Sequence, residues 1–213
     1  MNQPSLVRTA LVGLVLCLAA LPAAAGRPDL VARAGLAVSS VHQDDLASDA
    51  REGLALGLGA DIPLGGAWSL QPEVWYQRKG FHRGRLWDRV DVQQRTETVS
   101  VPVLVSYEFI AARLRPRAFA GLAVDVLLGS EISEPGGAWQ DVTDQDESAY
   151  VSLVLGAGAR LLDGRLDVDV RYQHGLTPAT DFDYTQFDDR VSENQEFDDA
   201  FDRTWLLTAG VWF

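Results

Sequence analysis

The last nine residues of the chain, Trp205-Leu206-Leu207-Thr208-Ala209-Gly210-Val211-Trp212-Phe213, decide the fold class. Counting back by twos from Phe213 gives an apolar face made of Val211, Ala209, Leu207 and Trp205. Period-two alternation of this kind indicates a β-strand with one apolar face. Such a strand can belong to a soluble sandwich or close a transmembrane barrel, so the remaining segments must distinguish the two.

The first residues have the features of an export signal. Arg8 precedes an apolar run over 10–21, and Pro22 is followed by the small residues Ala23, Ala24 and Ala25. About 12 apolar residues are too few for the ~20 that a spanning helix needs. We therefore predict a cleaved signal peptide over 1–25 and a single domain over 26–213. Cys17, the one cysteine, lies in the signal peptide, so the mature chain has no disulfide.

Seven further segments alternate like the last one. With it they cover 30–39, 53–62, 68–79, 99–109, 117–129, 150–161, 166–173 and 205–213. The clearest is 53–62, where Leu54, Leu56, Leu58, Ala60 and Ile62 share one face. The connections alternate between short (63–67, 110–116, 163–165) and long (40–52, 80–98, 130–149, 174–203). This is the outer-membrane pattern of short periplasmic turns and long external loops. Trp68, Tyr107, Phe109, Tyr172, Trp205 and Phe213 lie at strand ends, where interfacial aromatic girdles occur.

These features predict an all-β fold, an eight-stranded antiparallel up-and-down transmembrane β-barrel located in the outer membrane. No later apolar stretch is long enough for a spanning helix, and a sheet crosses hydrocarbon only when it is closed. The alternative is a soluble secreted sandwich, in which the same apolar faces point inward. The net charge is −12, and Lys79 is the only lysine. This balance argues against binding nucleic acid, whose phosphates need Lys and Arg.

The polar faces of the strands carry charged residues that a closed barrel places in its lumen. They are Arg33, Asp61, Glu73, Lys79, Glu108, Asp125, Arg160, Asp167, Asp169 and Arg171. Opposite charges confined together can pair, which offsets the desolvation of each. Because eight strands leave room for side chains and little else, we predict a lumen-filling salt-bridge network. A proton or ion path is the alternative.

The order of several short motifs resembles the PorT-like outer-membrane β-barrel family. The motifs are Ala34-Gly35-Leu36, Val74-Trp75-Tyr76-Gln77-Arg78-Lys79-Gly80, Val101-Pro102-Val103-Leu104, Phe119-Ala120-Gly121-Leu122, Leu155-Gly156-Ala157-Gly158-Ala159 and Val170-Arg171-Tyr172-Gln173-His174-Gly175-Leu176. The resemblance implies an eight-stranded barrel in the outer membrane of a diderm bacterium. The family's namesake is an accessory of a protein secretion system, but a shared barrel transfers no activity. No catalytic residues follow from it.

The external loops hold the remaining candidate sites. In the last loop, Asp181, Phe182, Asp183, Tyr184, Phe187, Asp188 and Asp189 interleave acids with aromatic rings, which suggests partner binding. Its acids and those of the preceding long loop lack any Ca²⁺-binding spacing, so we predict no metal site. His42, His82 and His174 fall in or beside three different long loops and could meet at the rim. No signature sets a nucleophile beside them, so we predict no catalytic residues and no cofactor.

The sequence therefore predicts an outer-membrane protein with a structural or loop-mediated binding role. The alternatives are a narrow channel for ions or small solutes and, third, a lipid-modifying enzyme that uses the histidines. The expected partners are outer-membrane lipid and lipopolysaccharide, an unidentified protein at the loops, and barrel-assembly machinery that recognises the strand ending in Phe213.

Overall fold

Eight long antiparallel strands make up nearly all of the described structure. The computed structural model describes residues 28–43, 46–47, 49–86, 90–109, 114–133, 137–143, 148–177 and 201–213. The strands are β1 (Asp29–Gln43), β3 (Asp49–Gly65), β4 (Trp68–Leu86), β5 (Val90–Glu108), β6 (Arg115–Ser133), β8 (Ala149–Leu161), β9 (Leu166–Gly175) and β10 (Phe201–Trp212). Two short strands, β2 (Leu46–Ala47) and β7 (Gln140–Asp141), pair with β1 and β6 at the loop end. The predicted signal peptide lies outside the described residues.

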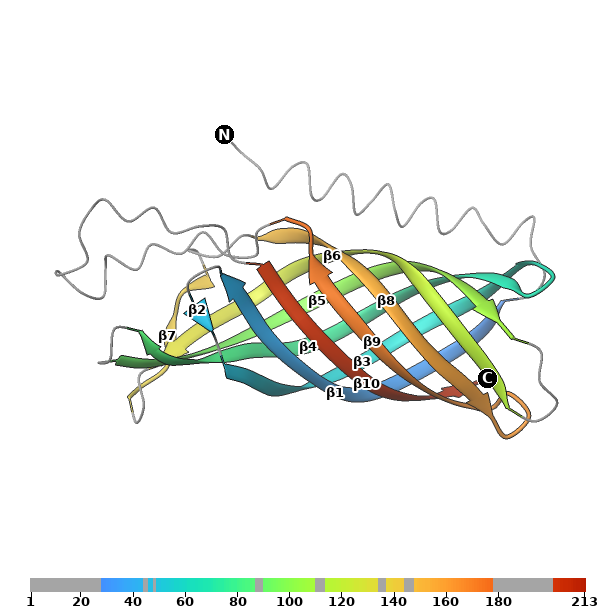
Figure 1. Cartoon of the computed structure of the whole chain (residues 1–213), viewed down its shortest axis with the longest axis horizontal. Helices are drawn as coiled ribbons and strands as arrows, with labels where there is room; N and C mark the ends of the chain where they lie inside the picture. Colours follow the sequence, from blue (N-terminus) through green and yellow to red (C-terminus); the bar gives the residue numbers. More distant parts are fainter. Residues whose placement is uncertain are drawn as a thin grey trace.

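The sheet closes on itself. Each long strand pairs with its neighbours in chain order, and β10 returns to pair with β1 from Val31↔Trp212 to His42↔Phe201. Leu30 and Phe213 exchange two backbone hydrogen bonds of 3.2 and 2.9 Å at the short-turn end. Figure 1 shows the result as strands tilted around a common axis. Closure satisfies the backbone groups of both edge strands, as hydrocarbon requires. No helix in these ranges is long and apolar enough to cross a membrane.

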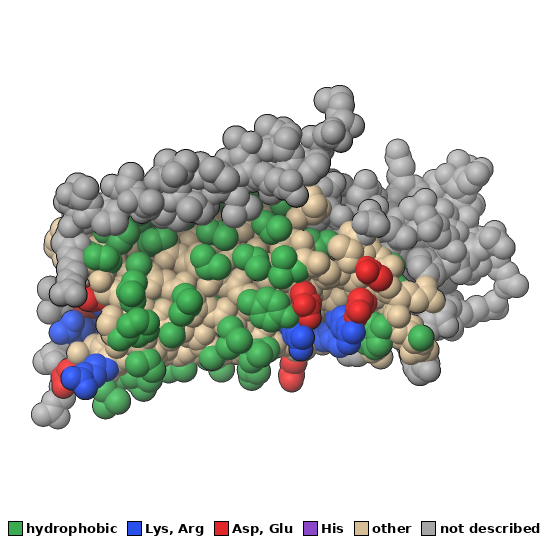
Figure 2. Space-filling view, turned by 180° about the vertical axis from the view of Figure 1, so that it is seen from behind, with side chains coloured by type: hydrophobic (Ala, Val, Ile, Leu, Met, Phe, Trp, Pro, Cys, Tyr) green, Lys and Arg blue, Asp and Glu red, His purple; other side chains and the backbone are tan. Residues whose placement is uncertain are grey.

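The outer wall is apolar. Leu36, Leu58 and Leu207 are 54%, 64% and 58% exposed, and they belong to the faces predicted to point outward. Figure 2 shows hydrophobic side chains over the middle of the visible wall and charged side chains toward its ends. A soluble sandwich buries these residues, so the closed sheet with apolar residues outside excludes that alternative.

Aromatic side chains gather near both ends of the apolar wall, as predicted. At the short-turn end Tyr107 packs edge-on against Trp68 and Phe109, with ring centroids 4.8 and 4.9 Å apart. Toward the loop end, Tyr172 of β9 lies 4.9 Å from Trp205 of β10. Rings with an apolar body and a polar tip are suited to the headgroup level of a bilayer.

The strands extend further toward the loop end than alternation predicted. Residues 80–98 were expected to form a long loop, but β4 continues to Leu86 and β5 begins at Val90. The other long connections are shortened in the same way, by strand residues within 40–52, 130–149 and 174–203. Beyond the lipid the outer face of a strand meets water and the inner face is polar throughout, so no apolar alternation marks these extensions.

The apolar wall predicts that the stability cost of an outward arginine depends on its depth in the membrane. Leu58→Arg, in the middle of the outer face of β3, should lower the free energy of unfolding by about 2–4 kcal/mol, because the guanidinium must enter hydrocarbon. Leu162→Arg, in the β8–β9 turn where Leu162 is 70% exposed, should cost about 0–1 kcal/mol. Urea unfolding in phospholipid vesicles, followed by tryptophan fluorescence, measures both. Equal losses would contradict the placement of the membrane.

Candidate functional site

The lumen contains a closely packed group of charged side chains. Alternation points Arg33 of β1, Glu73 of β4, Arg117 of β6 and the triad Asp167, Asp169 and Arg171 of β9 inward. All six residues are 4% exposed or less. Glycines on the same face make room for large side chains: a Cβ at Gly57 would lie 2.5 Å from the Trp75 ring, and one at Gly156 would overlap Phe119. The group is called the central network below.

Glu73 of β4 joins two arginines that come from β1 and β9, the two strands that flank β10. Its Oε1 accepts a hydrogen bond of 2.6 Å from Nη1 of Arg33 and one of 3.2 Å from Nη2 of Arg171. Its Oε2 accepts from Nη1 of Arg171 and, at 2.7 Å, from the indole Nε1 of Trp75. The carboxylate is therefore saturated with donors, which is the condition under which a buried charge is tolerated.

The two aspartates of β9 complete the network. Asp167 Oδ2 accepts from Nη2 of Arg33 at 2.9 Å and from Nη2 of Arg117 at 2.7 Å. Asp169 accepts from Arg117 at 2.8 Å, from Arg171 Nε at 2.8 Å and from the Thr208 hydroxyl at 2.7 Å. Three guanidinium groups face three carboxylates, so the central network is formally neutral. Its contacts run from β1 to β4, β6 and β9 and thus cross the lumen.

Aromatic and aliphatic side chains fill the space on the loop side of the central network. The Arg171 guanidinium lies 4.8 Å from the Trp75 ring centroid and 5.0 Å from that of Phe119. Trp75 packs with Ala37, Ala55 and Leu206, and Phe119 packs with Leu104, Ala123 and Val154. Stacking an arginine on a ring adds a favourable contact where water is absent. The charges and these two clusters together occupy the cross-section of the barrel.

A second polar group lies nearer the loops and is called the upper layer. Lys79 Nζ donates to Asp202 Oδ2 at 2.8 Å and to the Tyr150 hydroxyl at 3.2 Å, and it lies 3.7 Å from Asp125 Oδ1. Ser152 donates to the other oxygen of Asp125, and Thr204 donates to Asp202 at 3.1 Å. The only lysine of the chain is thus held between two carboxylates.

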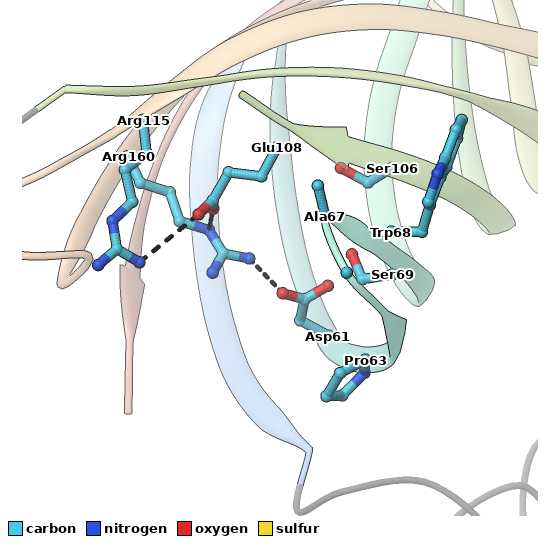
Figure 3. A pocket seen from close by; sticks show the side chains of 10 residues that line it. Asp61, Pro63, Ala67, Trp68, Ser69, Ser106, Glu108, Arg115 and Arg160 are labelled. Atoms are coloured by element: carbon cyan, nitrogen blue, oxygen red, sulfur yellow. Dashed lines mark hydrogen bonds and ion pairs between the residues drawn. The ribbon is translucent and has the colours of Figure 1, made fainter. Parts of the chain in front are cut away.

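A pocket of about 530 Å³ opens at the short-turn end. Its charged lining consists of Asp61, Glu108, Arg115 and Arg160 (Figure 3). Arg160 pairs with Asp61 and lies 3.5 Å from Glu108, which also faces Arg115 at 3.5 Å. Trp212 covers the Arg160 guanidinium at 4.0 Å. The two carboxylates and two guanidiniums balance one another, so this mouth is polar but formally neutral.

All ten predicted lumen residues lie on the inner face. Asp61, Glu108 and Arg160 are grouped at the mouth, Lys79 and Asp125 lie in the upper layer, and the other five belong to the central network. Two important members were missed. The predicted strand 117–129 begins at Arg117, whose side chain it assigns to neither face, and Asp202 falls in the predicted loop 174–203. The alternation of Phe119, Gly121 and Ala123, and of Thr204, Leu206 and Thr208, extends to both positions and could have identified them.

The predicted loop sites are less fully described. Asp181, Phe182, Asp183, Tyr184, Phe187, Asp188 and Asp189 lie outside the described residues, as do the side chains of His42 and His82. His174 lies on β9, and its ring stacks on Tyr172 at 6.2 Å. Among the described residues no three His, Cys, Asp or Glu side chains form a group able to hold a metal ion.

A closed antiparallel sheet with an apolar exterior and a charged interior defines a transmembrane β-barrel. Comparison with family models gives the more specific assignment. The model for the outer membrane protein beta-barrel domain matches residues 29–181. The chain belongs to this family and is located in the outer membrane.

Solved structures with the same fold come from several bacteria. Neisserial surface protein A is 11% identical, with a TM-score of 0.50, over 88% of this chain and 100% of that one. Ail, the attachment invasion locus protein of Yersinia pestis, is 17% identical, with a TM-score of 0.47, over 88% of this chain and 100% of its own. OprG of Pseudomonas aeruginosa is 11% identical, with a TM-score of 0.44, over 87% and 95%. No curated protein matches the sequence. Similarity at these identities concerns the fold alone.

Because the Glu73 carboxylate accepts hydrogen bonds from two arginines and Trp75, we expect its neutralisation to destabilise the barrel strongly. Glu73→Gln should lower the free energy of unfolding by about 3–5 kcal/mol, because Arg33 and Arg171 lose their shared counter-ion. The control is Glu97→Gln, since Glu97 is half exposed and pairs with Arg78 on the outer wall; its loss should be about 0–1 kcal/mol. Chemical unfolding in detergent micelles measures both. Similar losses for the two variants would contradict a network that is essential to stability.

Proposed function

We propose that this protein has a structural or binding role in the outer membrane, with the loop end as its working surface. The observation that carries the proposal is the central network, in which six charged side chains from four strands are paired across the lumen and at most 2% exposed. A barrel plugged in this way offers its outer wall and its ends to other molecules.

The network argues against the alternative of a narrow channel. An ion entering the lumen would have to displace guanidinium groups that each hold two carboxylates, and it would also have to pass the packed rings of Trp75 and Phe119. Breaking one buried pair costs several kcal/mol, and a path needs several to open together. The same side chains that stabilise the barrel thus oppose conduction.

The geometry around His174 supports a role without catalysis. Its ring lies parallel to Tyr172 on the outer face, and its buried Nδ1 has no hydrogen-bond partner among the described residues. A hydrolase histidine is oriented by a carboxylate on one nitrogen and faces a nucleophile with the other. A lipid-modifying activity remains the third alternative, because the side chains of His42 and His82 lie outside the described residues.

The length of the strands supports the loop end as the working surface. β4 and β5 each have 19 residues, whereas about 9–11 suffice to cross a bilayer. The exposed Arg78–Glu97 pair of 3.0 Å lies on the outer wall, and eight further residues of β4 follow it to Leu86. Arg95 and Glu131 form a second exposed pair above it. Regular strands therefore support the loops beyond the apolar wall.

The proposed partners follow from these surfaces. Outward arginines near the end of the apolar wall suit the phosphates of outer-membrane lipid and lipopolysaccharide. The strand that ends in Phe213 is the element that assembly machinery would engage. A protein partner would bind the external loops, and the PorT-like motif order makes a secretion accessory the more specific form of this proposal.

Planar-bilayer recordings test the plugged lumen. The wild-type barrel should give no unitary conductance steps, because the central network fills the cross-section. The double variant Glu73→Ala and Arg171→Ala removes one charge of each sign and much side-chain volume, so it should produce steps. The control is Glu97→Gln, which leaves the lumen intact. Reproducible steps from the wild type would contradict the proposal and favour the channel.

Replacing residues 178–200 with a Gly/Ser linker of equal length tests the loop role. The replacement keeps Thr177, whose hydroxyl accepts a hydrogen bond from the Val151 amide at 2.9 Å. We expect loss of envelope integrity, measured as sensitivity to detergent and large antibiotics in a strain that lacks the wild-type copy. Replacing 144–147 in the same way is the control for loss of acidic residues alone. Full complementation by the 178–200 variant, with a heat-modifiable band showing a folded barrel, would contradict a role for this loop.

A further inference from the structure

Of the three polar groups defined above, the upper layer is the one whose charges do not balance. The central network has three positive and three negative groups, and the mouth has two of each. In the upper layer Lys79 faces both Asp125 and Asp202. Lys79 donates to Asp202 at 2.8 Å, whereas its distance of 3.7 Å to Asp125 is beyond hydrogen-bond range. One negative charge is therefore left on Asp125, which is fully buried.

Four buried side-chain oxygens, one of them on Asp125, have no hydrogen-bond partner among the described residues. They are Asp125 Oδ1, Gln77 Oε1, Thr98 Oγ1 and Gln173 Oε1. Their residues are at most 2% exposed. Buried oxygens are normally paired, since each orphan costs free energy. The central network contains one such oxygen, Oδ1 of Asp167, whereas four at one level of the lumen are the arrangement that a bound cation would satisfy.

The pairing of the strands places these four residues in one layer. Gln77 of β4 is the cross-strand neighbour of Thr98 of β5, and Ser100, the next inward residue of β5, is the neighbour of Asp125 of β6. Gln173 reaches from β9 across the lumen, where its Nε2 donates to Ser100 at 3.4 Å. The oxygens thus come from four strands around the same section of the lumen.

The upper layer is closed toward the short turns and accessible from the loop side. Below it lie the Trp75 and Phe119 clusters and the central network. The Asp202 side chain is 11% exposed, whereas those of Asp125, Asp167 and Asp169 are fully buried. The partly exposed Asp202 side chain marks the loop side as the side from which a small ion would enter.

We propose that the upper layer binds one monovalent alkali cation, Na⁺ or K⁺, through Asp125 and the side-chain oxygens of Gln77, Thr98 and Gln173. The donors are hard oxygens, which suit alkali and alkaline-earth ions. A single excess negative charge selects a monovalent ion, because a divalent ion beside Lys79 would leave the layer with a net positive charge. The proposal revises the sequence-based expectation that the chain has no metal site, and it does not depend on the role of the loops.

The test compares unfolding of the detergent-folded mature protein in NaCl, KCl and N-methylglucamine chloride at equal ionic strength. A ligand that binds only the folded state raises the unfolding midpoint in a saturable way. We expect a higher midpoint with Na⁺ or K⁺ than with the bulky organic cation. Equal midpoints in the three salts would overturn the proposal.

Two variants locate the site. Asp125→Asn should abolish the difference between salts, and Thr98→Val, which removes one oxygen at similar volume, should reduce it. The latter keeps the test valid if the aspartate variant fails to fold. Ser106→Ala is the control, since Ser106 is a buried hydroxyl near the mouth; it should retain the full salt difference. Thallium anomalous scattering in crystals should give a peak beside Asp125, and a peak elsewhere in the lumen would overturn the assignment.

Discussion

The hydrogen-bond ladder between β1 and β10 is the interaction on which the rest of the structure depends. An open edge in hydrocarbon leaves backbone groups without partners, so the sheet crosses the membrane only as a closed ring. Closure fixes which face meets lipid, and it therefore requires apolar side chains outside and polar ones inside. With eight strands the enclosed space is narrow, so the polar side chains contact one another rather than water. The central network is the consequence.

The charged side chains of the lumen are grouped in layers, and those of the central network have several partners each. Each guanidinium of the central network meets more than one carboxylate, and Arg171 is also covered by two rings. Multiple partners compensate for the desolvation of a buried charge better than an isolated pair does. The layers differ in net charge. The neutral central network is purely structural, whereas the upper layer, with its excess negative charge, has the capacity to bind a ligand.

Much of the barrel could be predicted because outward apolar and inward polar residues alternate along each strand with a period of two. Leu54, Leu56 and Leu58 identify an outward face, and residues such as Glu73 and Asp169 then follow as inward ones. The ends of the strands could not be predicted in this way. Around Gln93 and Arg95 the outer face of the strand is polar and the inner face carries Gln94, which is buried against Ser130. Polar residues therefore occupy both faces, and the segment resembles a loop. The pairing of Arg33 with Asp167 was also out of reach, because strand tilt and register decide which inward residues meet.

The central network also has a consequence for the order of folding. Arg33 and Asp167 are separated by 134 positions, and Glu73 and Arg171 by 98. Contacts between such distant segments form late, because the intervening chain must be ordered first. Until β1 meets β10 the charges face the water inside an incomplete ring. Ion pairs that form after the rate-limiting step slow unfolding without accelerating folding. We therefore expect the charged lumen to lengthen the lifetime of the finished barrel in the membrane.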